Sequence, residues 1–223
     1  MSKNQYENAD IQDVKEAARK TVEQGSDIRN EVRNLTLKIL SQGNLDVEKM
    51  SQVVRAVIEG ASIGAEAKGT QVKDALLDTM AGMDEALAKS AEASKLAIEE
   101  AAGHLKDFSS HDLKRAVDDL LTLEKLFFET IQDVAKGSNE MIRGTLNDLI
   151  NHAQQSSSSV GITSSNVVTS LNQKLGNTLK DTVSASAHAS LETGAHIANT
   201  AAGILEGIAD SLQTANKGKS DKE

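Results

Sequence analysis

Cysteine, proline and tryptophan are absent from this sequence of 223 residues, and aromatic residues are scarce, with one Tyr and three Phe. Without cysteine the chain can form no disulfide and has no thiolate nucleophile or thiolate metal ligand. Without proline it lacks the residue that most strongly breaks a helix. Aromatic side chains bury the largest areas in protein cores, so an aromatic content of 2% favours thin helical packing over a β-sandwich or an α/β core.

Long apolar segments are also absent. The opening residues, MSKNQYENADIQDVKE, contain no apolar stretch of the kind that marks a signal peptide. Residues 149–173 contain no Asp, Glu, Lys or Arg, but they are rich in Ser, Asn and Gln and therefore do not predict a membrane span. We expect a cytoplasmic protein without a transmembrane segment.

An excess of acidic residues lies in the middle of the chain. The net charge is −9 and the isoelectric point is near 5.1, which argues against nucleic acid as a partner. Residues 46–110 hold twelve acids and seven bases, a balance of −5, and residues 111–153 hold eight and five, a balance of −3. The central helices should therefore carry acidic outer faces.

The central region repeats its apolar residues every eleven positions. An eleven-residue step equals three helical turns at 3.67 residues each, so positions related by this step stay on one face of a helix. Three such registers are apolar except at Gly69 and Ser94: Val54, Ala65, Leu76, Leu87 and Ile98; Val47, Ile58, Gly69, Met80, Ala91 and Ala102; Met50, Ala61, Val72, Met83, Ser94 and Leu105.

The unbroken phase of this repeat predicts one continuous helix over residues 46–106, about 90 Å long at 1.5 Å per residue. The alternative is a break at Gly69-Thr70, with Thr70 as the N-cap of a second helix, since glycine destabilises a helix interior by about 1 kcal/mol.

Two pairs of glycines lie four residues apart on helical stripes. Gly60 and Gly64, whose row Ala56 extends, and Gly203 and Gly207 near the C-terminus would each allow two helix backbones to approach closely. We interpret the rows as sites of tight helix crossing.

The remaining pattern completes an all-α fold, an elongated bundle of about four long amphipathic helices with eleven-residue periodicity. Such periodicity is typical of a straight or right-handed coiled coil. The sequence predicts a single domain over residues 1–216, followed by a disordered tail. The predicted segments are helices 9–42, 46–106, 111–153 and 166–215, a Ser-rich linker at 154–165 and the tail at 217–223.

No motif in the sequence predicts catalysis or cofactor binding. Three acid–His pairs are spaced four residues apart, whereas di-iron helices use a three-residue spacing, so we interpret the pairs as exposed helix pairs and expect no metal site. They are Glu100/His104, Asp148/His152 and Glu192/His196. Adjacent acids such as Asp84/Glu85 point about 100° apart on a helix and indicate a solvated face. We expect a protein that is not an enzyme and has no cofactor.

The residues most relevant to function are those of the apolar stripes, which serve either helix packing or binding to an apolar surface. The candidate stripe residues are Val54, Ile58, Gly60, Gly64, Leu76, Met80, Met83, Leu87, Ile98, Phe127, Phe128, Ile197, Gly203 and Gly207.

The Ala- and Ser-rich composition and helical pattern of two segments without Pro or Cys resemble those of phasins, the bacterial proteins that coat polyhydroxyalkanoate storage granules. These are EALAKSAEASKLAIEEAAGHLKDF (85–108) and DTVSASAHASLETGAHIANTAAGILEGIADSL (181–212). The eleven-residue repeat is also similar in style to those of apolipoproteins and perilipins. The resemblance covers most of residues 46–215, and the chain departs from phasins in having only Tyr6 as an aromatic residue before residue 108. The resemblance implies a granule-associated, structural role.

We therefore expect a self-associating structural protein that covers a hydrophobic particle, or organises an assembly, with its amphipathic helices. The alternative is a soluble coiled-coil adaptor that binds a protein partner along the acidic faces of helices 46–106 and 111–153. Added salt should weaken the acidic contact but not apolar adsorption. A bundle that unfolds into membranes is disfavoured, because the stripe weakens to Ser, Thr and Ala over residues 182–196.

Overall fold

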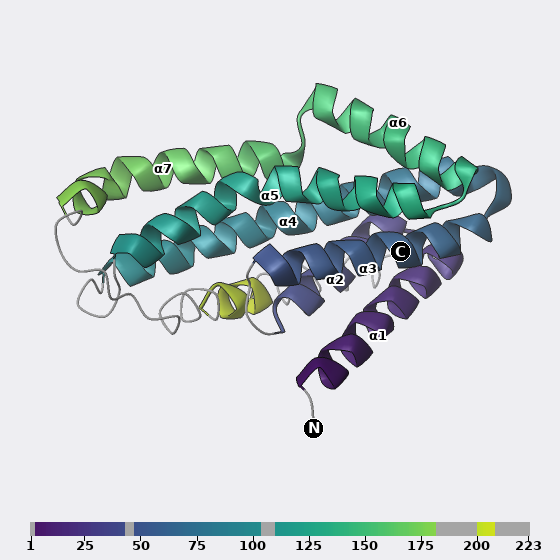
Figure 1. Ribbon diagram of the computed structural model, residues 1–223, viewed down its shortest axis with the longest axis horizontal. Helices are drawn as coiled ribbons and strands as arrows, with labels where there is room; N and C mark the ends of the chain where they lie inside the picture. The colour runs from purple at the N-terminus through teal and green to yellow at the C-terminus, as the bar shows by residue number, and fades with distance from the viewer. Residues whose placement is uncertain (1–2, 43–46, 104–109, 182–199, 208–223) are drawn as a thin grey trace, which may run out of the picture.

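The computed structural model describes residues 3–42, 47–103, 110–181 and 200–207, and these residues are almost entirely helical, with no strand among them (Figure 1). The all-α prediction is therefore confirmed. The elements are α1 (Lys3–Gln24), α2 (Ile28–Leu40), α3 (Val47–Glu66), the 3₁₀ turn η1 (Gly69–Gln71), α4 (Val72–Gly103), α5 (Ser110–Gly137), α6 (Glu140–Ser156) and α7 (Ser159–Asp181). Residues 200–207 are also helical.

The four N-terminal helices form two parallel pairs. Along α1 and α3 the contacts advance in the same direction: Lys15 Nζ lies 2.8 Å from Glu59 Oε2, and Lys68 Nζ donates to the Gly25 carbonyl at 3.0 Å. Along α2 and α4, Arg33 Nη1 lies 3.2 Å from Glu85 Oε2. The turns between α1 and α2 and between α3 and α4 are therefore the bends of two helical hairpins that pack side by side.

The C-terminal helices cover the other side of α4. Helix α5 packs against α3 and α4, and α7 packs against α4 and α5. In Figure 1, α6 and α7 follow one another above α5: α7 lies along it, whereas α6 rises away from the body of the protein. Helix α6 packs mainly on α5 and contacts α4 to a smaller extent. No helix of the described residues is both long enough and apolar enough to cross a membrane.

The core is thin, and small residues supply much of it. On α4 the buried alanines outnumber the large apolar residues, and they are Ala75, Ala86, Ala88, Ala91, Ala93, Ala97 and Ala101. The largest fully buried side chains are spread over five helices: Leu37, Leu40, Ile58, Leu76, Met83, Leu87, Ile98, Leu123, Phe127, Ile131 and Ile142.

The prediction of about four long helices is wrong, because three of them are interrupted. Predicted helix 9–42 is broken between Gln24 and Ile28, where Asp27 acts as the N-cap of α2 by accepting from the Asn30 backbone N–H. Predicted helix 111–153 is broken between Gly137 and Glu140, where the Asn139 side chain accepts from the Ile142 N–H at 3.0 Å. In each case a short polar side chain caps a new helix directly after a glycine turn.

The prediction of one continuous helix over residues 46–106 is also wrong, and the alternative, a break at Gly69, is confirmed. Gly69 has a φ of +59°, a left-handed conformation that ends α3, and η1 then leads into α4. Helix α4 begins at Val72, so it does not begin directly after Thr70, the N-cap that the alternative named. The eleven-residue phase survives the turn because α3 and α4 bury their stripes in the same core. Such a phase reports the buried face and not the direction of the chain.

The Ser-rich linker at 154–165 and the predicted start of the last helix at 166 are wrong as well. Helix α6 continues to Ser156, only Ser157 and Ser158 separate it from α7, and α7 begins at Ser159. The Ser158 hydroxyl accepts from the Gly161 N–H at 3.0 Å, so this serine caps a helix. The weak stripe at 182–196 and the tail at 217–223 lie outside the described residues.

Three glycines allow the parallel helices to touch backbone to backbone. A Cβ atom at Gly60 would lie 2.0 Å from the carbonyl oxygen of Lys15, and one at Gly64 would lie 2.4 Å from that of Arg19. On the second pair, a Cβ at Gly82 would lie 2.3 Å from the carbonyl oxygen of Arg29. Only glycine fits at these positions, because the obstructing atoms belong to a helix backbone.

We predict that Gly60→Ala and Gly64→Ala each lower the free energy of unfolding by about 1–3 kcal/mol, because the added methyl group forces α1 and α3 apart. Gly144→Ala on α6 is the matched control, since nothing lies within 4 Å of its Cβ position. That control should stabilise the protein by about 0.5–1 kcal/mol through helix propensity. Urea denaturation followed by circular dichroism measures all three, and equal effects of the three substitutions would contradict the close contact.

We predict that Gly69→Ala destabilises the protein by about 1–2 kcal/mol, the cost of a left-handed conformation for a residue with a Cβ. Gly69→Asn should cost less, because asparagine tolerates this conformation. The same denaturation measurement tests both variants. Stabilisation by Gly69→Ala would indicate a continuous helix instead.

Candidate functional site

The predicted stripe residues lie inside the protein wherever the structure describes them, with the exception of the C-terminal glycines. Gly60 and Gly64 are buried against α1. The apolar members are at most 6% exposed: Val54, Ile58, Leu76, Met80, Met83, Leu87, Ile98, Phe127 and Phe128. Gly203 and Gly207 are exposed, with nothing within 4 Å of their Cβ positions, and Ile197 lies outside the described residues. In the described residues the stripes are thus closed.

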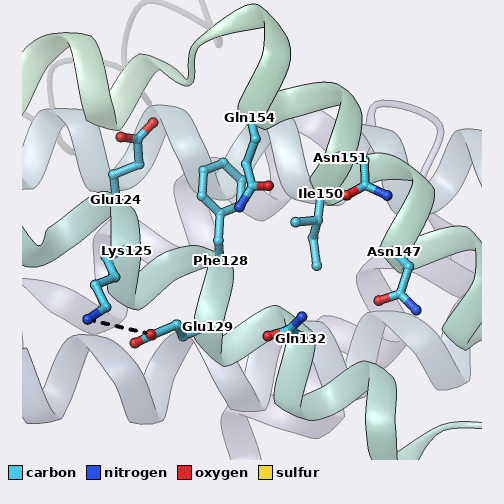
Figure 2. Close-up of a pocket in the computed structure, with 9 residues that line it drawn as sticks. All are labelled: Glu124, Lys125, Phe128, Glu129, Gln132, Asn147, Ile150, Asn151 and Gln154. Carbon is cyan, nitrogen blue, oxygen red and sulfur yellow. Dashed lines mark ion pairs between the residues drawn. The ribbon is translucent and has the colours of Figure 1, made fainter.

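A groove with a volume of 680 Å³ lies between α5 and α6 (Figure 2). Phe128 from α5 and Ile150 from α6 are the apolar residues that line it. The polar residues that line it are Glu124, Lys125, Glu129 and Gln132 from α5, and Asn147, Asn151 and Gln154 from α6. The Lys125 ammonium lies 3.7 Å from the Glu129 carboxylate, on the α5 side of the groove.

Phe128 of α5 and Ile150 of α6, which line this groove, belong to the same buried core as the other large apolar residues of α6. We use the name α5–α6 seam for Phe128 of α5 together with Ile142, Leu146, Leu149 and Ile150 of α6, all of which are buried. The ring of Phe128 packs against that of Phe127, with centroids 5.3 Å apart and planes inclined by 45°. The seam therefore contains one of the few aromatic side chains of the chain and the large apolar residues of α6.

Polar contacts hold the first end of α6. The Arg143 guanidinium donates to the carbonyl oxygens of Ala135, Lys136 and Ser138, at 3.3, 3.4 and 2.9 Å, and so caps the C-terminus of α5. The Asn139 side chain donates to Glu66 Oε1 at 2.6 Å, which ties the turn to the end of α3. The turn itself is thus anchored by backbone and side-chain contacts.

Two carboxylates fix the other end of α6 and the start of α7. Asp84 on α4 accepts from the backbone N–H groups of Ser159 and Val160 at 2.7 and 2.9 Å. Glu124 on α5 accepts from the Ser158 hydroxyl at 2.5 Å. A Cβ at Gly161 would lie 2.2 Å from Glu124 Oε1, so glycine there makes room for the carboxylate. Negative charge at a helix N-terminus is favourable, so the carboxylates of Asp84 and Glu124 stabilise the start of α7.

Sequence reasoning missed the cap that Asp84 provides for α7 and the partners of the neighbouring Glu85. Asp84 and Glu85 were expected to share a solvated face, but Asp84 caps α7 and Glu85 pairs with Arg29 and Arg33 of α2. The run SSSSVG before α7 was the available signal, since serine and glycine mark helix starts as well as linkers.

A second acidic group is engaged between α3 and α5. Asp133 Oδ1 lies 2.9 Å from Lys136 Nζ, and Asp133 Oδ2 lies 3.6 Å from Arg55 Nη2. The hydrogen bond from Lys136 and the nearby Arg55 hold the pKa of Asp133 below its usual value. These contacts link surface charges between helices and bring no acid–base pair into a cleft.

The acid–His pairs are not brought together into a site in the described residues. Asp148 and His152 are both exposed on α6. His104 and the Glu192/His196 pair lie outside the described residues. Among the residues that the structure describes, no three His, Asp or Glu side chains converge in a way that could hold a metal ion.

We predict that Asp84→Ala lowers the free energy of unfolding by about 1–2 kcal/mol, because two N–H groups at the start of α7 lose their acceptor. Asp78→Ala is the matched control: Asp78 is on the same helix and makes no hydrogen bond or ion pair with the described residues. Thermal unfolding of both variants provides the comparison. An Asp84→Ala protein as stable as the control would show that the cap contributes nothing.

Comparison with known proteins gives a family but no relative of established role. No curated protein matches the chain, and no solved structure matches it. A family model described as a family of unknown function, DUF6781, matches residues 2–214, and the chain belongs to this family.

Proposed function

We propose that the protein is a non-catalytic structural protein that covers hydrophobic particles with its amphipathic helices, in the manner of phasins. The observation that carries the proposal is the make-up of the buried stripes. They run along the helices as apolar faces, and on α4 alanine is the most frequent buried residue.

Helix contacts made by alanine side chains require little free energy to separate. Full burial of a leucine or isoleucine side chain contributes about 1.5–3 kcal/mol, whereas the single methyl group of alanine contributes about 0.8 kcal/mol. A particle surface that receives the same apolar face restores this contribution when the helices part. Closed stripes are therefore compatible with a protein that is a bundle in solution and a coat on a surface.

The charge contacts favour this function over an adaptor that binds along the acidic faces. Several carboxylates on these faces already have partners within the chain: Glu59 pairs with Lys15, Glu85 with Arg29 and Arg33, and Glu99 with Lys174. Asp84 caps α7. These acids are less available to an external basic partner than the sequence suggested.

The proposal predicts that the purified protein floats with polyhydroxybutyrate particles in a density gradient, at low and at high salt. Apolar adsorption survives salt, while contact through acidic faces weakens. Protein that stays in the soluble fraction at both salt concentrations would contradict the proposal.

Leu121→Gln provides the matched control for this measurement. Leu121 is 58% exposed, more than any other large apolar side chain in the described part of the chain. Because the proposal assigns binding to the buried stripes, this variant should float as well as the native protein. Loss of flotation in the variant would instead indicate adhesion through exposed surface residues.

A further inference from the structure

We propose that α6 swings away from α5 and that the α5–α6 seam is the surface that adsorbs to an uncharged hydrophobic particle. This inference rests on the proposed coating function and names the part of the protein that performs it.

Short turns flank α6, and the one that follows it is strained. The turn before α6 consists of Ser138 and Asn139 and follows Gly137, the last residue of α5, whose Cβ position has nothing within 4 Å. The turn after α6 contains Ser157, which has a φ of 65° and is the one residue other than glycine with a positive φ in the described part of the chain. A serine in this conformation is strained, so rotation at Ser157 would relieve strain rather than create it.

Along its length α6 is held by apolar contact alone. Between residues 120–134 of α5 and residues 144–156 of α6, the described structure has no side-chain hydrogen bond and no ion pair. The Arg143 contacts lie at the first turn and can persist during the swing, whereas the far end of α6 has to turn at Ser157 or release the Ser158–Glu124 hydrogen bond. By contrast, α1 is joined to α3 by Lys15–Glu59 and α2 to α4 by Arg33–Glu85.

A groove and the absence of close backbone contact through its glycine also set α6 apart from the N-terminal helices. The 680 Å³ groove separates the outer edges of α5 and α6. Gly144, the glycine of α6, is exposed and meets no neighbouring helix, whereas the Cβ positions of Gly60, Gly64 and Gly82 coincide with the backbone of a neighbouring helix. Helix α6 can therefore leave α5 without breaking a backbone contact of the kind that joins the N-terminal pairs.

Opening uncovers the larger apolar side chains of this region. Phe128, Ile142, Leu146, Leu149 and Ile150 are each at most 6% exposed in the closed form. Aligned on two helices joined by a short turn, they would form one apolar face with polar residues on its flanks. Such a face is suited to lie flat on a hydrophobic surface.

The charges beside the seam indicate that this surface is uncharged. Helices that lie on anionic membranes carry Lys and Arg on their polar faces. Here the groove presents the carboxylates of Glu124 and Glu129 and the amides of Asn147 and Asn151, with Lys125 engaged by Glu129. With a net charge of −9, the protein would be repelled by an anionic bilayer, so we commit to an uncharged, apolar particle surface.

A covalent bridge across the groove tests the inference. Because the chain has no cysteine, Gln132→Cys with Asn147→Cys places a single reactive pair on opposite walls of the groove, and a short bismaleimide can join them. We expect the bridged protein to lose flotation with polyhydroxybutyrate particles at least tenfold relative to the same variant without the bridge. Vesicles of anionic phospholipid should bind neither form.

The matched control joins Asn147→Cys to Asn151→Cys, one turn apart on α6, with the same reagent. This bridge leaves the seam free to open, so flotation should equal that of the unbridged protein. If the protein bridged across the groove floats as well as the unbridged form, the inference is overturned and the coating function stands. If neither the native nor any variant protein floats, the coating function fails, and the inference fails with it.

Discussion

Carbonyl oxygens of α1 and α2 occupy the places where side chains would begin at Gly60, Gly64 and Gly82 of the opposing helices. A chain with three Phe and no Trp cannot fill wide gaps between helices, so its helices must lie close together. Glycine makes that approach possible, and many weak contacts between adjacent backbones replace a few large buried groups. The parallel arrangement of α1 with α3 and of α2 with α4 depends on this contact, and the ion pairs along both seams add to it.

The C-terminal helices pack against each other in a different way. Helix α5 carries two of the three Phe residues, and its contacts with α6 are made by side chains rather than by backbone. Polar contacts are concentrated at the ends of α6, on Arg143 and next to it on Ser158. In the described structure no side-chain hydrogen bond or ion pair joins residues 120–134 of α5 to residues 144–156 of α6. One protein thus combines a closely packed N-terminal part with a helix that is fastened at its ends. This difference in packing would let α6 open while the N-terminal pairs stay closed, and a coat has to uncover apolar surface without unfolding the whole protein.

The sequence predicted the helical class, the buried face of each helix and the possibility of close contact at Gly60 and Gly64. It offered a turn at Gly69 only as the alternative to a continuous helix, because the eleven-residue phase runs through Gly69 while the chain reverses there. It also could not show that Asp84 caps α7, because residues 84 and 159 are adjacent only after folding. Periodicity reports which side of a helix is buried. Turns and tertiary caps depend on contacts between distant segments, and periodicity carries no information about these contacts.

Native-state hydrogen exchange along the whole chain tests the central claim most directly, because it measures the opening free energy of each helix separately. The account predicts that buried amides of α3, around Val57 and Ala61, exchange only through global unfolding. Amides of α6, around Leu146 and Ile150, should exchange through a smaller opening of lower free energy. Exchange of α6 and α3 in one cooperative event, with equal opening free energies, would contradict the account.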